Sequence, residues 1–158
     1  MFVLFTTLNF SQNKLEKIIS LGFEVRNCTI GSNPTNNKAE LDVIVNFTFI
    51  KKKIETGFGY ESFKAIGFNK YTFSIGRQIK ITEDLKLIPA LEFTDIQRSK
   101  EIKGYYLSLA GNLALRHKIN NSFEVELLIN ALPRTDLLIE YDDFRIVYSN
   151  YLKLVYKL

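Results

Sequence analysis

Polar and apolar residues alternate along the last stretch of the chain, from Phe144 to Leu158. Apolar side chains occupy every second position over most of this stretch, and polar ones such as Lys153 and Lys157 lie between them. A period of two is the pattern of a β-strand with one apolar face. Because the strand runs to the last residue, we expect it to be paired and buried against apolar material over its whole length.

Seven earlier runs show the same alternation. Tyr71, Phe73 and Ile75, for example, alternate with Thr72 and Ser74. The seven runs cover residues 19–26, 40–49, 54–61, 70–79, 85–94, 105–116 and 123–130. Short alternating runs bounded by polar segments are typical of strands rather than helices. The pattern therefore predicts eight strands.

The segments between the runs are alternately long and short. The long ones cover residues 29–38, 62–69, 95–103 and 132–143, and the short ones cover 51–53, 82–84 and 118–121. Outer-membrane barrels carry long extracellular loops at one rim, and tight periplasmic turns and both termini at the other. The pattern therefore predicts an all-β fold, an eight-stranded antiparallel up-and-down transmembrane β-barrel. At 158 residues the chain is long enough for one such domain.

Alternation leaves open which face of the barrel points inward. A soluble lipocalin-like carrier would enclose the apolar rows, whereas a membrane barrel would turn them toward lipid. The carrier remains an alternative, although the chain has no tryptophan and lipocalins usually carry a Gly-x-Trp near the first strand. The direction of Phe23, Val43, Leu107 and Leu127 separates the two: outward for a membrane barrel, inward for a carrier.

Charges on the polar rows favour the membrane barrel. Acids and bases nearly cancel there, and glycines, serines and threonines share the same rows, which suits a narrow lumen filled by side chains. We therefore predict a salt-bridge network in the lumen. Its members are Glu24, Arg26, Glu40, Asp42, Glu55, Glu61, Lys70, Lys86, Glu92, Arg116, Glu124, Glu126, Arg145, Lys153 and Lys157.

Aromatic residues fall into two groups along the predicted strands. Lipid interfaces select such girdles on either side of an aliphatic band. The group expected near the loop rim is Tyr60, Tyr71, Phe93, Tyr105 and Tyr148, and the group near the turn rim is Phe47, Phe49, Phe123 and Tyr156. We predict that both groups face lipid.

The first residues resemble a secretory signal. An apolar run from Phe2 to Phe10 is followed by Ser11, a small residue of the kind found before a cleavage site, although a basic segment before the run is missing. We expect residues 1–11 to be a truncated signal peptide and 12–158 to form the barrel. The other interpretation of the apolar run is a first strand.

The stretch from Lys17 to Leu158 resembles the small outer-membrane β-barrel proteins of Gram-negative bacteria, the OmpA/OmpX-like group. The ending resembles their C-terminal signal for the barrel-assembly machinery, carried here by Leu152, Leu154, Tyr156 and Leu158. That signal usually ends in an aromatic residue, whereas this chain ends in leucine. The resemblance implies an outer-membrane location and contact with the lipid bilayer and the assembly machinery.

The sequence contains no recognisable catalytic, metal or cofactor site. His117 is the one histidine and is expected at a tight turn, away from the outer leaflet where barrel enzymes use serine and histidine. Cys28 is the one cysteine, so a zinc cluster of cysteine and histidine is excluded. Scattered bases and a net charge of +4 provide no patch for nucleic acid. We expect a non-enzymatic protein with a structural or surface-interaction role in the envelope.

Two further expectations concern the rims and the lumen. Bases in or beside the long loops could contact lipopolysaccharide phosphates: Lys38, Lys64, Lys100, Lys103, Arg98 and Arg134. The apolar segment 137–141 is expected to extend two strands as a protruding hairpin whose open edge could pair with a partner. A narrow pore is the remaining alternative, but eight strands leave little room once charged side chains fill the lumen.

Overall fold

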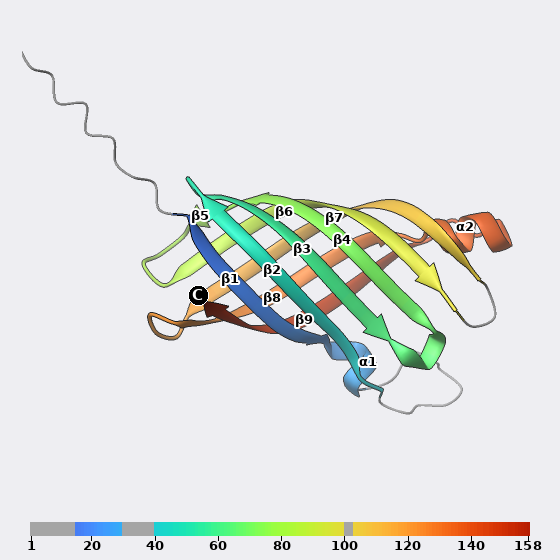
Figure 1. Cartoon of the computed structure of the whole chain (residues 1–158), viewed down its shortest axis with the longest axis horizontal. Coiled ribbons are helices and arrows are strands. Elements are labelled where there is room, and N and C mark those ends of the chain that lie inside the picture. Colours follow the sequence, from blue (N-terminus) through green and yellow to red (C-terminus); the bar gives the residue numbers. More distant parts are fainter. Residues whose placement is uncertain (1–14, 30–39, 100–102) are drawn as a thin grey trace, which may run out of the picture.

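Eight long antiparallel strands close into a barrel in the computed structural model, which describes residues 15–29, 40–99 and 103–158 (Figure 1). The strands are β1 (Glu16–Glu24), β2 (Asp42–Lys51), β3 (Ile54–Phe63), β4 (Phe68–Arg77), β6 (Leu85–Arg98), β7 (Gly104–Lys118), β8 (Phe123–Pro133) and β9 (Ile146–Lys157). The two-residue β5 (Ile79–Lys80) follows β4 after Gln78 and pairs with β6. The predicted eight-stranded up-and-down barrel is confirmed.

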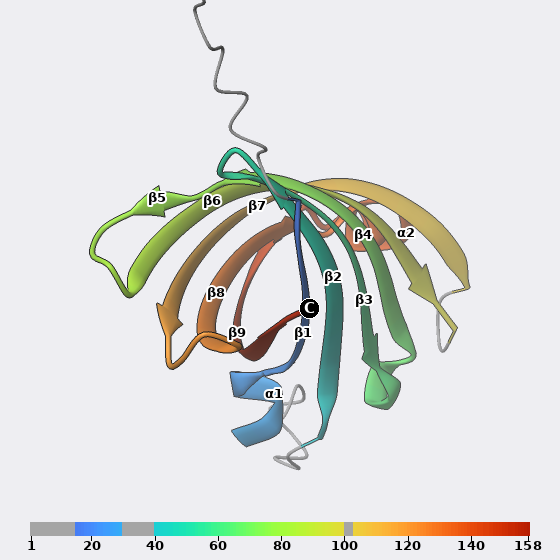
Figure 2. The same ribbon diagram turned by 60° about the vertical axis from the view of Figure 1, so that its left-hand side comes forward.

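The last strand closes the barrel by pairing on both of its edges. β9 pairs with β1, from Ile18 opposite Lys157 to Glu24 opposite Tyr151, and with β8 on its other side. β4 and β6 pair directly, so neighbouring strands are joined around the complete ring. Figure 2 shows the sheet curving around this ring. Closure removes the open sheet edges that a bilayer would not tolerate.

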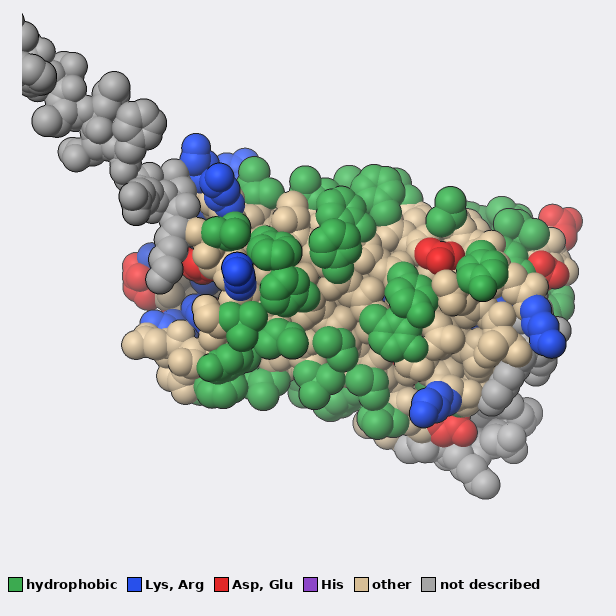
Figure 3. Space-filling view, in the orientation of Figure 1, with side chains coloured by type: hydrophobic (Ala, Val, Ile, Leu, Met, Phe, Trp, Pro, Cys, Tyr) green, Lys and Arg blue, Asp and Glu red, His purple; other side chains and the backbone are tan. Residues whose placement is uncertain are grey.

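Apolar side chains of the long strands point outward. Phe23, Leu107 and Leu127 are 37%, 79% and 44% exposed, and Val43 on the same face of β2 is half-buried. Figure 3 shows apolar side chains spread across the wall of the barrel. The carrier alternative is therefore wrong, because it requires these rows to line the interior. None of the described helices is long and apolar enough to cross a membrane.

The barrel interior contains three apolar clusters. Ile18, Ile50 and Val155 pack together near the turn end. A second cluster contains Ile44, Ile88, Ala114, Leu128 and Tyr151, and a third, toward the loop end, contains Phe63, Phe68, Ile96, Tyr106, Ala110 and Leu132. Charged groups fill the lumen between these clusters, as described below.

Tight turns and long connections lie at opposite ends, as predicted, with one exception. The segment expected to be a long loop over residues 62–69 is a short connection, a 3₁₀ turn η1 (Lys64–Ile66) ended by Gly67 at a positive φ of 61°. β3 and β4 remain paired up to Phe63 opposite Phe68, because both rings enter the apolar cluster inside the barrel. The strict alternation of long and short loops is therefore wrong at this position.

Two helices replace strand structure that the alternation predicted. α1 (Val25–Thr29) ends the first strand at Glu24, and α2 (Thr135–Tyr141) occupies the segment expected to form a protruding hairpin. The hairpin prediction is wrong, because β8 and β9 stop pairing at Pro133 opposite Ile146 and the segment between them forms α2. Both helices lie at the loop end of the barrel (Figure 1).

Candidate functional site: a charged lumen inside an apolar wall

Arg116 is the centre of the ionic cluster nearer the turn end. Its guanidinium Nη1 lies 2.7 Å from Glu55 Oε1, and its Nη2 lies 2.5 Å from Glu126 Oε2. β3, which carries Glu55, is not a sheet neighbour of β7, which carries Arg116, so this ion pair crosses the lumen. Gln78 also donates a hydrogen bond to Glu55. All three charged groups are buried, so each depends on the others for its hydrogen bonds.

Three lysines extend this cluster. Lys153 Nζ lies 3.3 Å from Glu126 Oε1, on the opposite carboxylate oxygen from the arginine. Lys86 and Lys157 both pair with Glu124, at 3.3 and 2.8 Å. Their side chains are 23% and 27% exposed, whereas Glu124 is almost fully buried. They therefore mark where the ionic network reaches the turn-side opening.

Lys70 is the centre of a second cluster. Its Nζ lies 2.7 Å from Glu61 Oε2 and 3.4 Å from Glu92 Oε1, and its side chain is 1% exposed. Tyr151 donates a hydrogen bond to Glu61 from the far side of the lumen, and Asn112 donates one to Glu92 at 2.7 Å. Glu61 and Glu92 thus share the Lys70 ammonium, and each also accepts a hydrogen bond from an uncharged side chain.

Glu24 and Asp42 lie closer to the loop end and have neutral partners. Glu24 accepts the backbone N–H groups of Asn27 and Asn150, and Asp42 accepts the side-chain amide of Asn27 at 2.8 Å. Asn27 is the buried residue of α1, so this short helix is attached to the lumen wall by two carboxylates.

Three residues predicted for the lumen lie outside it. Arg26 and Glu40 are exposed, because β1 ends at Glu24 and β2 begins at Asp42, so neither residue lies on a strand. Arg145 is 65% exposed and pairs with Asp143, 2.7 Å away, in the connection before β9. The other twelve predicted members are buried or half-buried on the inner face: Glu24, Asp42, Glu55, Glu61, Lys70, Lys86, Glu92, Arg116, Glu124, Glu126, Lys153 and Lys157.

Asp136 is a buried acid of α2 at the loop end, and the sequence analysis missed it. It is 0% exposed and accepts a bidentate contact from Arg134, with Nε to Oδ1 at 2.7 Å, while Arg98 Nε lies 3.9 Å away. Arg134 also stacks its guanidinium over Phe68, 5.2 Å from the ring centre. Polar residues directly before the apolar run 137–139 are a helix-start signal that could have identified this position.

This arrangement changes the expectation for the loop-side bases. Arg98 and Arg134 form ion pairs with Asp136, so they are not available to bind phosphates in this conformation. Lys64 and Lys103 are exposed, and Lys38 and Lys100 lie outside the described residues. The predicted signal peptide, residues 1–11, also lies outside them.

The space left in the lumen is small. A cavity of about 50 Å³ lies between the two ionic clusters, among residues that include Glu55, Glu92, Arg116 and Lys153. A bound water occupies about 30 Å³, so this volume accommodates one or two waters. At this level, between the two ionic clusters, charged and polar side chains therefore leave room for little more than water.

The predicted aromatic residues lie on the outer wall. Tyr60 and Tyr71 pair at 5.0 Å between β3 and β4, and Phe123 pairs with Tyr156 at 5.1 Å between β8 and β9. Tyr105, Tyr148 and Phe93 are more than half exposed, and Phe47 and Phe49 are half-buried in contact with each other.

A row of phenylalanines across β3, β4 and β6 was not anticipated. Phe58 and Phe73 lie 5.3 Å apart, and Phe73 and Phe93 lie 6.5 Å apart. Phe93 thus belongs to a band that crosses three strands, rather than to a girdle of single rings. The rings meet only through the cross-strand register, which one sequence does not reveal.

The histidine and the cysteine, which could take part in catalysis or bind a metal, lie on different elements. His117 is exposed at the turn end of β7, and Cys28 is a free, half-buried thiol in α1. Within the described ranges there is no group of three or more histidines, cysteines or acids arranged to hold a metal ion.

Comparison with known proteins gives a likeness of fold. No protein-family model and no curated protein matches the chain. The Yersinia pestis outer membrane protein Ail, solved in a phospholipid bilayer nanodisc, aligns with a TM-score of 0.59 at 13% identity, over 92% of this chain and 100% of that one.

Two designed proteins have the same architecture. A de novo transmembrane β-barrel aligns at TM-score 0.55 and 9% identity, covering 92% of this chain and 96% of its own. The designed barrel TMB2.3 aligns at TM-score 0.53 and 16% identity, covering 92% and 94%. The resemblance to small outer-membrane barrels, expected from the sequence, is confirmed at the level of fold.

Proposed function

We propose that this chain is an integral outer-membrane protein of a Gram-negative bacterium with a non-enzymatic role in envelope structure or surface interaction. The observation that carries this proposal is the polarity of the barrel: large apolar side chains cover the outside while ion pairs are buried inside. Exposing such a wall to water is unfavourable, whereas lipid removes that cost. The fold of Ail, a protein named for the outer membrane, supports the same location.

The proposed orientation follows from the two rims. The tight turns and the end of β9 face the periplasm, and the connections carrying α1 and α2 face outward. Leu152, Leu154, Tyr156 and Leu158 project from the outer wall and are 40–67% exposed. Their side chains are therefore accessible to the barrel-assembly machinery, as the proposed terminal signal requires.

Surface interaction is assigned to the outward rim. Lys64 and Lys103 are exposed there and would supply cations to lipopolysaccharide phosphates. The network around Asp136 gives α2 a fixed position, so this helix would present a constant surface to a partner.

The narrow-pore alternative is disfavoured by the contents of the lumen. Buried ion pairs such as Arg116 with Glu55 cross the interior, and the cavity between the clusters has room for only one or two waters. A conducting path would require several of these pairs to separate, at considerable cost in an interior of low polarity. We expect no discrete single-channel conductance in planar-bilayer recordings.

Fractionation and gel mobility test the proposed location. The protein should sediment with outer membranes, require detergent for extraction, and migrate differently on gels before and after boiling, since the closed barrel resists unfolding. Recovery as a water-soluble monomer without detergent would overturn the proposal.

A further inference from the structure

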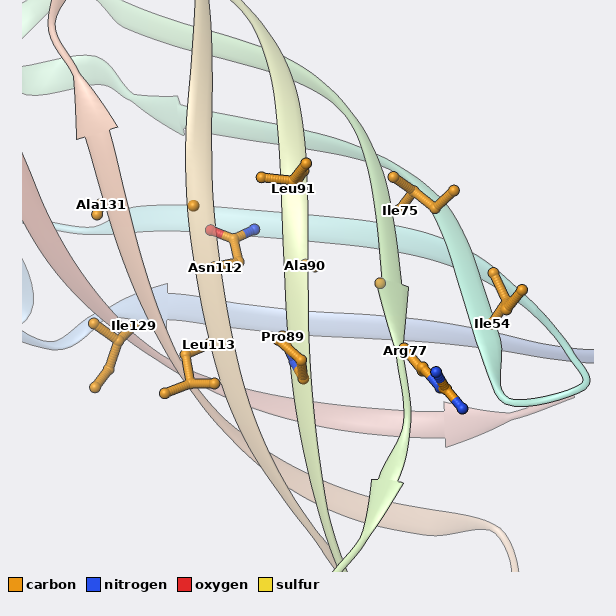
Figure 4. Close-up of a pocket in the computed structure, with 12 residues that line it drawn as sticks. Ile54, Ile75, Arg77, Pro89, Ala90, Leu91, Asn112, Leu113, Ile129 and Ala131 are labelled. Atoms are coloured by element: carbon orange, nitrogen blue, oxygen red, sulfur yellow. The ribbon is translucent and has the colours of Figure 1, made fainter.

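An apolar groove crosses the outer wall of β4, β6, β7 and β8. Its volume is about 640 Å³, and its lining includes Gly111. Figure 4 shows Pro89 and Ala131 among the larger side chains of Leu91, Leu113 and Ile129. Gly111 lies opposite Ala131, so two small residues are neighbours across the β7–β8 pair, and Leu91 lies opposite Gly111 on the other side. Four strands at a spacing of about 4.8 Å give the groove a length of about 14 Å.

Gly111 is a lining residue of this groove with open space in front of it. A Cβ atom added there would meet no atom within 4 Å. The glycine therefore faces open volume on the outer wall rather than a close neighbour in the sheet, and its lack of a side chain leaves the groove empty.

One end of the groove carries an arginine. Arg77 is the last residue of β4, on the outward row that also contains Ile75, and its side chain is exposed. It has no ion-pair partner among the described residues. It is in register with Ile54, the first residue after the β2–β3 turn, so it lies near the turn-side rim. A guanidinium among apolar side chains at this depth would contact lipid headgroups.

The turn-side rim is basic as a whole. Exposed bases there are Lys17, Lys51, Lys52, Lys53, Arg77 and Lys80, whereas the exposed acids are Glu16, Glu83 and Asp84. Glu83 pairs with Lys80, so it does not neutralise the arginine. Such a rim attracts an anionic membrane surface.

From these features we propose that the groove binds one anionic phospholipid of the turn-side leaflet, with an acyl chain against Gly111 and Ala131 and its phosphate on Arg77. Arginine suits this role because its planar donors match phosphate oxygens in pairs. This inference rests on the proposed membrane location.

A second apolar groove provides an internal comparison. It lies over β1 and β9, with a volume of about 400 Å³ and a lining that includes Leu21, Phe23 and Leu154. Its one charged lining residue, Lys153, is buried and paired with Glu126 inside the barrel. This groove therefore has no cation to select a headgroup, and we assign it no specific lipid.

Native mass spectrometry in dodecyl maltoside micelles tests the inference. The folded protein is titrated with palmitoyl-oleoyl phosphatidylglycerol or with phosphatidylcholine carrying the same chains. Wild type should retain one phosphatidylglycerol in preference to phosphatidylcholine. Arg77→Ala should weaken phosphatidylglycerol binding roughly fivefold to tenfold, the effect of losing a charged contact to an anionic headgroup. It should weaken phosphatidylcholine binding less, because the choline cation offsets the phosphate charge, so the preference for phosphatidylglycerol should shrink.

Gly111→Leu should weaken both lipids, because the new side chain fills the groove without meeting the sheet. Matched controls are Lys17→Ala, which removes an outward base from the same rim on β1, and Leu107→Phe, which enlarges an outward residue of β7 away from the groove. Both controls should bind lipid as wild type does.

Equal effects of Arg77→Ala and Lys17→Ala would overturn the inference, since they would indicate attraction by the rim alone. A dimer that Gly111→Leu abolishes would also overturn it, because the occupant would then be a second copy. Insertion into phosphatidylcholine vesicles is measured first for every variant. Failure of wild type to insert would count against the membrane location, whereas insertion without lipid preference would count against the groove only.

Discussion

At the scale of single residues, Arg116 shows why the lumen charges depend on one another. It is 4% exposed and supplies donors to two carboxylates on different strands, Glu55 and Glu126. Removing water from one charge costs several kcal/mol, and the cost is recovered only when partners with good geometry are present. Deleting the arginine leaves two buried carboxylates, of which Glu126 retains Lys153.

Arg116→Leu should therefore lower the free energy of unfolding by about 3–5 kcal/mol, the usual cost of breaking a buried pair on one side. Urea unfolding of the barrel in detergent micelles, followed by circular dichroism and the mobility shift on gels, measures this change. Arg145→Leu is the control, because that arginine is exposed and paired only with Asp143, so it should cost less than about 1 kcal/mol. Equal losses for the two variants would contradict a buried lumen network.

At the scale of elements, the sequence predicts the strands well and their ends poorly. Alternation marks each strand because one face meets an apolar phase and the other a polar lumen. The first strand ends early because Asn27 donates hydrogen bonds to Glu24 and Asp42. The contact with Asp42 joins residues that are distant in the sequence, so the alternation does not predict it. The same limit applies to the site, where most inner-face charges follow from alternation but Asp136, outside any strand, does not.

The β2–β3 turn makes a prediction about local strain. Lys52 and Lys53 form a two-residue connection with φ values of 52° and 69°. This left-handed conformation costs an L residue about 1–2 kcal/mol, and asparagine followed by glycine adopts it more readily. The double variant Lys52→Asn and Lys53→Gly should raise the free energy of unfolding by about 1–2 kcal/mol in the same urea assay.

Lys51→Asn is the matched control for this turn. It removes a neighbouring positive charge from a residue that remains in β2, so it should leave stability nearly unchanged. A gain from the control equal to that from the double variant would assign the effect to charge repulsion among the three lysines instead of backbone conformation.

The position of α2 depends on Asp136. Asp136→Asn keeps the shape of the side chain but removes the charge that Arg98 and Arg134 share. Loss of a charged hydrogen bond of this kind should raise the population of the released helix, and with it the rate of tryptic cleavage after Arg134, about tenfold. Asp143→Asn, in the same connection, should change the rate of cleavage after Arg134 little, because Asp143 pairs with Arg145 instead. Equal acceleration by both variants would count against a role for Asp136 in holding α2 in place.

At the scale of the whole molecule, polarity is inverted relative to a water-soluble barrel. Ion pairs and amides occupy the centre, and the apolar surface faces outward on all eight long strands. This inverted polarity places different requirements on the outward and the inward residues of the barrel. Outward positions need only remain apolar, whereas inward ones need particular partners, so the effect of a new charge depends on the face that receives it.

Leu127→Arg tests this difference. Leu127 is 44% exposed on the outer wall near the middle of β8. An arginine there would lie in hydrocarbon, so folding into phosphatidylcholine vesicles should become less favourable by about 2–4 kcal/mol. Ile119→Arg is the control, because Ile119 is exposed in the turn between β7 and β8, where water receives the charge and the cost should be below about 1 kcal/mol. Dodecyl maltoside micelles adapt around a charge more easily than a bilayer does. The difference in folding free energy between Leu127→Arg and Ile119→Arg should therefore be smaller in micelles than in vesicles. An equal, small cost for both variants in vesicles would mean that β8 does not cross the hydrocarbon.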